Sequence, residues 1–116
     1  MITRPGHDQN CPNHSCWNKD YQVQALRVEL ADGNVYVFPY RRFAFARFES
    51  GIGRDTLQVV LDTHEIQITG KHLRGIAVAF QKFAVDWLRE LPDRYVSQVD
   101  DGQAWVTGIT VTEAQH

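Results

Sequence analysis

The chain has 116 residues, of which 43% are hydrophobic and 22% charged, and its formal net charge at pH 7 is −2. These values are ordinary for one globular domain. The charge argues against a general duplex-binding protein, which would carry a clear basic excess. The sequence contains neither an apolar run long enough for a membrane helix nor the apolar stretch of a secretory signal after Met1. We therefore expect a cytoplasmic protein that does not enter membranes.

Residues 1–20 hold two prolines and both cysteines but almost no aliphatic side chains. Such a segment cannot bury enough apolar surface to become ordered. We expect a flexible arm at residues 1–20, followed by a single α+β domain at residues 21–116. Two free thiols are the simplest expectation for the arm, and a disulfide between its cysteines is an alternative. The arm also contains four side chains that can bind zinc, namely His7, Cys11, His14 and Cys16.

Alternating apolar residues flank Asp32-Gly33, which is the strongest short signal for a β-hairpin. A two-residue turn there predicts that Leu30 lies opposite Val35 and that Val28 lies opposite Val37. These apolar side chains would then meet on one face of the sheet. The other face of the second strand would carry three aromatic residues, Tyr36, Phe38 and Tyr40.

A strand or extended segment is expected at residues 41–48, ahead of a loop at residues 50–53. The next apolar alternation predicts a second hairpin, with Leu61 opposite Ile66 and Val59 opposite Ile68. One apolar face again results from this pairing.

From about residue 70 to residue 90, apolar residues recur at spacings of three and four, which predicts one long amphipathic helix. Pro92 would end this helix. Its core-facing stripe would include Phe80 and Trp87. Val78 and Val85 interrupt its polar side and suggest a self-association surface. A strand at residues 104–112 follows, and Trp105 within it adds to the candidate interface.

Together these elements predict an α+β domain in which antiparallel hairpins form a curled sheet or partly open barrel packed against the helix, followed by the C-terminal strand. This arrangement is pleckstrin-homology-like by element order only. The segments 26–33, 38–40 and 64–73 resemble those of a class of short, uncharacterised bacterial α+β proteins, over roughly residues 24–112. The resemblance implies a fold unit and no catalytic activity.

Basic residues stand at the expected start of the helix, where proteins usually place Asp or Glu. A phosphate or carboxylate bound at the helix N-terminus would compensate for them. In a second basic stretch, residues 41–54, arginines alternate with aromatic residues. This pattern is typical of surfaces that stack the bases of single-stranded nucleic acid. The candidate anion- or nucleic-acid-binding residues of the two stretches are Arg41, Arg42, Arg47, Lys71, His72 and Arg74.

The sequence contains no nucleophile–base pair and no catalytic metal or hydrolase motif, so we expect no enzyme and no cofactor. The leading hypothesis is a non-enzymatic interaction domain that acts through protein–protein contacts and self-associates. The alternative is a binder of single-stranded nucleic acid, of a nucleotide or of another anion, through residues 41–54 and 70–74. A third hypothesis is an arm that docks only when zinc is bound.

Overall fold

The computed structural model describes residues 15–91 and 102–114. In this part of the chain, eight strands, one α-helix and a short 3-10 helix form an α+β fold, as expected from the sequence. In chain order the elements are β1 (Trp17–Lys19), β2 (Ala25–Glu29), β3 (Val35–Pro39), η1 (Tyr40–Arg42), β4 (Phe43–Ser50), β5 (Asp55–Leu61), β6 (His64–Lys71), α2 (Arg74–Gln81), β7 (Val85–Arg89) and β8 (Trp105–Glu113).

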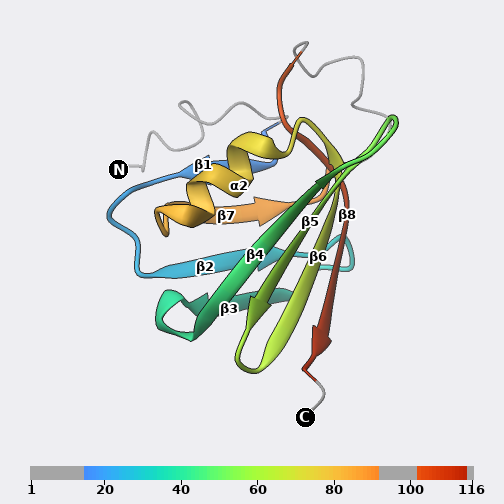
Figure 1. The fold of residues 1–116 in the computed structure, drawn as a ribbon. Coiled ribbons are helices and arrows are strands. Elements are labelled where there is room, and N and C mark those ends of the chain that lie inside the picture. The colour runs from blue at the N-terminus through green and yellow to red at the C-terminus, as the bar shows by residue number, and fades with distance from the viewer. Residues whose placement is uncertain (1–14, 92–101, 115–116) are drawn as a thin grey trace, which may run out of the picture.

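The strands form two four-stranded sheets (Figure 1). The first sheet has the order β1-β7-β2-β3, and the second has the order β4-β5-β6-β8. Pairing is antiparallel except between β2 and β7, which are parallel. The described strands form no closed barrel, so the expected barrel-like and pleckstrin-homology-like arrangement is not confirmed.

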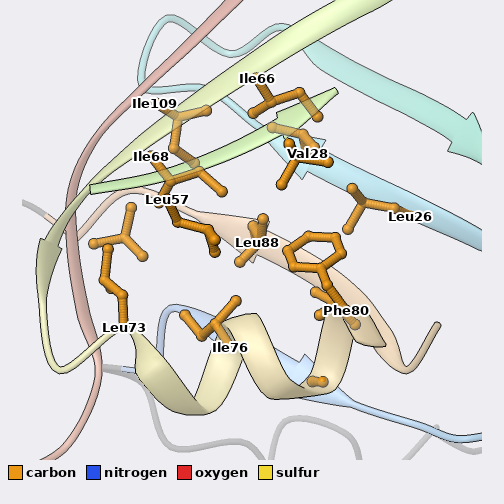
Figure 2. Close-up of a cluster of buried hydrophobic side chains, with 14 of the residues drawn as sticks. Leu26, Val28, Leu57, Ile66, Ile68, Leu73, Ile76, Phe80, Leu88 and Ile109 are labelled. Atoms are coloured by element: carbon orange, nitrogen blue, oxygen red, sulfur yellow. The ribbon is translucent and has the colours of Figure 1, made fainter. Parts of the chain in front are cut away.

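One apolar core joins both sheets and the helix. Figure 2 shows side chains from β2, the second sheet, α2 and β7 pointing toward one another. The residues drawn and labelled there are all buried: Leu26, Val28, Leu57, Ile66, Ile68, Leu73, Ile76, Phe80, Leu88 and Ile109. Because these side chains come from elements far apart in the sequence, their burial holds the two sheets and α2 together.

The expected helix over residues 70–90 is wrong in its length. The helix covers only Arg74–Gln81, and the chain then turns into β7. The turn is a Schellman motif: Ala84 N–H donates to Ala79 O at 2.9 Å, and Phe83 N–H donates to Phe80 O at 3.1 Å. Phe83 takes the left-handed conformation there, with φ 53°. Glycine usually occupies this position, so the sequence gives no recognisable stop signal.

The segment after the turn becomes an inner strand of the first sheet. β7 lies between β1 and β2, and Val85 and Leu88 are buried in the core. Trp87 lies opposite Arg27 of β2 and Asn18 of β1. Because paired residues share a face of the sheet, Trp87 lies on the outer face and not on the core face that the helical spacing predicted.

The first hairpin forms, but its pairing differs from the predicted pairing by one residue. Val28 lies opposite Tyr36, and Glu29 lies opposite Val35. The loop has three residues instead of two, with Gly33 at φ 93° and its N–H bonded to Leu30 O at 3.0 Å. A shift of one residue exchanges the two faces of a strand. The aromatic residues of β3 therefore face the core, and its valines face solvent.

The second hairpin forms with its pairing displaced by two residues. Val59 lies opposite Ile66, and Leu57 lies opposite Ile68, because the connection is only Asp62-Thr63. An even displacement keeps every side chain on its predicted face. The strands predicted at residues 41–48 and 104–112 correspond to β4 and β8, but β4 begins only at Phe43, since Arg41 and Arg42 belong to η1, and it continues to Ser50.

The segment just before residue 20 belongs to the fold, which corrects the expected boundary of the arm. Trp17–Lys19 form β1 and pair with β7, and Cys16 is fully buried. The remainder of the expected arm, residues 1–14, lies outside the described residues.

Candidate interaction surface

The outer face of the first sheet carries apolar side chains at its edge. Val35 and Val37 of β3 are 54% and 63% exposed, respectively. Across β2 they lie opposite Glu29 and Arg27, which form an ion pair at 2.8 Å. This pairing balances the charges beside the valines and leaves an apolar strip along β3.

The main chain of β3 is also available along this edge. In the described residues no strand pairs with the other side of β3. Leu30 N–H donates to Asn34 O at 2.9 Å, which fixes the alternation of hydrogen bonds in the antiparallel pair. That alternation directs the N–H and C=O groups of Val35 and Val37 away from β2. We call these two side chains with their outward main-chain groups the β3 surface.

An aromatic and a basic residue extend the same face toward β1. Trp87 lies in the same cross-strand row as Arg27 and Val37. The guanidinium of Arg89 stands over the Trp87 ring at 5.2 Å from its centroid, and Arg89 Nε donates to Ser15 O at 2.8 Å. Trp and Arg are the residues most often found as energetic anchors in protein interfaces.

The signals that could have located this surface are local. Gly33 as the third residue of a three-residue loop is a known hairpin pattern. Burying Tyr36 and Phe38 removes more apolar area from water than burying Val35 and Val37 would. Both arguments favour the observed register over the predicted one.

The structure separates the members of the basic aromatic stretch. Tyr40 is buried, and Phe43 packs against the core from β4, with its ring 6.1 Å from that of Phe80. The Arg42 guanidinium is bonded to Asp62 at 2.8 Å. Arg41 lies exposed in η1, while Phe45 and Arg47 lie exposed on β4. No continuous row of stacked aromatic residues and arginines therefore forms in the described residues.

The Tyr40 side chain is buried and forms hydrogen bonds inside the protein. Its hydroxyl donates to Val85 O at 2.6 Å and accepts from Val85 N–H at 3.0 Å. Burial raises the pKa of this hydroxyl above its usual range. The side chain thus remains a neutral donor and acceptor that joins η1 to β7.

The residues at the helix start remain close together on the surface. Lys71 and His72 line a hollow beside the β4–β5 connection. Arg74 is the first residue of α2, and its guanidinium lies over the Phe48 ring at 4.9 Å from the centroid. Lys71 and His72 therefore line one hollow, whereas the Arg74 guanidinium lies over an aromatic ring of β4 and is not part of that lining.

The three interface residues predicted from the sequence are dispersed. Val78 is 48% exposed on α2, whereas Val85 is fully buried in β7. The expectation of a helix face shared by both is wrong, since only one of them lies in a helix. Trp105 is also buried, and its Nε1 donates to Leu91 O at 3.0 Å. β8, which contains it, does lie at the edge of the second sheet.

Of the four candidate zinc ligands, only Cys16 lies within the described residues. Its Sγ donates to Ala104 O at 3.2 Å, and burial raises the pKa of the thiol. A buried, protonated thiol is a poor metal ligand, because zinc binds the thiolate. His7, Cys11 and His14 lie outside the part of the chain that the structure describes.

Among the described residues, no group of three or more His, Cys, Asp or Glu side chains is arranged to hold a metal ion. In the same residues no helix has the length and apolar character needed to cross a membrane. Comparison of the chain with protein-family models, curated proteins and solved structures finds no match.

Proposed function

We propose that the protein is a non-enzymatic interaction domain that binds protein through the β3 surface and self-associates there. The observation that carries this proposal is the combination, on one edge strand, of two exposed valines with main-chain groups that pair with no other described strand. Edge strands usually carry charges or prolines that prevent pairing with other chains. Residues 35–38 of β3 carry neither, and only Pro39 closes the strand.

Two chemical features suit protein contacts. An added strand would bond to the outward main-chain groups of Val35 and Val37, which is the mode of recognition known as strand addition. The adjacent Trp87 and Arg89 offer a larger area for a partner that also covers the sheet face. The Arg27–Glu29 ion pair lies between the β3 surface and Trp87 and adds no net charge there.

Light scattering on two matched variants tests this function. Val37→Lys places a charge on the β3 surface, and Val78→Lys places the same charge on an exposed valine of α2. We expect the wild type to self-associate, Val37→Lys to be monomeric, and Val78→Lys to behave like the wild type. Circular dichroism should show all three folded, because both valines are exposed.

Two results would contradict the proposal. A wild type that stays monomeric at high concentration removes self-association. Dissociation by Val78→Lys alone moves the interface to α2, as the helical pattern first suggested. Salt separates the proposal from the nucleic-acid alternative, because a nucleic-acid complex weakens steeply as salt rises, whereas an apolar contact does not.

A further inference from the structure

A hollow lies at the end of the second sheet where the β4–β5 connection meets the start of α2. It has a volume of about 250 Å³, and its lining includes Arg54, Lys71 and His72. The pairing of β5 with β6 explains the meeting, because Asp55 lies opposite Gly70. The residues that flank this pair on either strand are Arg54 and Lys71. In Figure 1 the β4–β5 connection and the β6–α2 connection lie at the upper end of the second sheet.

The lining is rich in basic side chains. Within residues 15–91 and 102–114, Arg54, Lys71 and His72 form no ion pair. Lys71 is held beside the Trp105 ring, with its ammonium 5.9 Å from the ring centroid. The lining has one carboxylate, Asp55, whose Oδ2 accepts the N–H of Leu73 at 3.1 Å.

Two of the residues that line the hollow are glycines of the β4–β5 connection. Gly53 has φ 74°, a conformation that residues with a side chain rarely adopt. At Gly51 a Cβ atom would lie 2.6 Å from Arg54 O. The connection therefore favours glycine at both positions, and neither contributes a side chain to the lining.

We propose that this hollow binds a small oxyanion of the phosphate type. The basic side chains of Arg54 and Lys71, beside one carboxylate that already accepts a hydrogen bond, favour an anion. The volume is below the usual range of about 300–1,000 Å³ for pockets that hold drug-sized molecules, so it fits a phosphate group better than a large ligand. This site lies on the second sheet, away from the β3 surface, and does not depend on the proposed interaction function.

An NMR titration of the amide signals with sodium phosphate tests the site, with sodium chloride of equal ionic strength as the reference. We expect saturable shifts centred on residues 51–54 and 71–73. Arg54→Gln and Lys71→Gln should each weaken phosphate binding by about fivefold, because each removes one charge at the anion. Lys71→Arg keeps the charge and should keep the binding.

The matched control is Arg41→Gln, which removes the same charge from an exposed arginine of η1. Equal weakening by this variant would overturn the proposal, since it would show an effect of net charge alone. Shifts identical in phosphate and chloride would also overturn it. Adenosine monophosphate as a second probe shows whether the hollow prefers a phosphate ester or free phosphate. Tighter binding of adenosine monophosphate than of phosphate indicates a phosphate ester, and equal binding indicates the free ion. A single-stranded oligonucleotide that binds while both small probes fail would contradict the proposal.

Discussion

Removal of one oxygen atom from Tyr40 tests how η1 is joined to β7. The Tyr40 hydroxyl bonds to both main-chain groups of Val85, which lies 45 positions away along the chain and has no exposed surface. Tyr40→Phe keeps the ring and its packing against Phe80 and Phe83 but leaves the N–H and C=O of Val85 without this partner.

The expected loss follows from the burial of these groups. A buried main-chain group left without a hydrogen bond costs about 1–3 kcal/mol. Two such groups give a loss of about 3 kcal/mol or more in the free energy of unfolding, against a total of about 5–15 kcal/mol for a domain. With a urea m-value of about 1.5 kcal/mol/M, the midpoint of unfolding should fall by about 2 M.

Urea unfolding followed by circular dichroism measures this shift, and Tyr36→Phe is the matched control. The Tyr36 ring stacks on Phe38 with centroids 5.6 Å apart, and its hydroxyl forms no hydrogen bond with the described residues. We expect the control to unfold within about 0.5 kcal/mol of the wild type. If Tyr40→Phe unfolds at the same urea concentration as Tyr36→Phe, the hydroxyl does not hold β7 as argued.

Two further predictions concern the β6–α2 region and alkaline pH. At Gly70 a Cβ atom would lie 2.0 Å from Trp105 O, so Gly70→Ala should destabilise the protein by about 1–3 kcal/mol or more in thermal unfolding. At Gly75 of α2 a Cβ atom would meet no neighbouring group outside the helix backbone, so Gly75→Ala should stabilise the protein by about 0.5–1 kcal/mol in the same assay. Because burial raises the Tyr40 pKa above its usual 10.0, the unfolded chain loses this proton at a lower pH than the native protein, and the free energy of unfolding should fall as pH rises above about 10.0. This part of the slope should be missing from Tyr40→Phe, and an unchanged slope would contradict the assignment.

The alternation of apolar residues was sufficient to predict the buried face of a strand wherever that strand pairs with its neighbour in the sequence. The second hairpin shows this. Its connection is shorter than predicted, yet Val59 and Ile66 are buried as expected, because the displacement of two residues preserves the alternation of a strand. β8 was also predicted from such an alternation. Lys71 and His72 line the same hollow because they are adjacent in the chain.

The first hairpin shows how one residue in a loop decides a surface. The Asp-Gly signal placed the turn correctly, but the third loop residue changed the register by one. This exchanged the faces of β3 and produced the exposed valines of the β3 surface. Which face is buried depends on what the opposite sheet can cover. Tyr36 and Phe38 pack near the His64 ring, with centroids 6.0 Å and 5.3 Å away.

Only the tertiary structure determined that residues 82–91 form a turn and a strand, and which residues line the hollow beside the β4–β5 connection. Apolar spacings of three and four continue past Phe83, so nothing local distinguishes a helix from a turn followed by a strand. β7 pairs with β1 on one side and with β2 on the other. In this position Val85 and Leu88 are buried in the core, and Trp87 lies on the outer face of the sheet. Arg54 joins Lys71 only through the pairing of β5 with β6. Both outcomes depend on contacts between segments distant in the sequence, which a local periodicity does not contain.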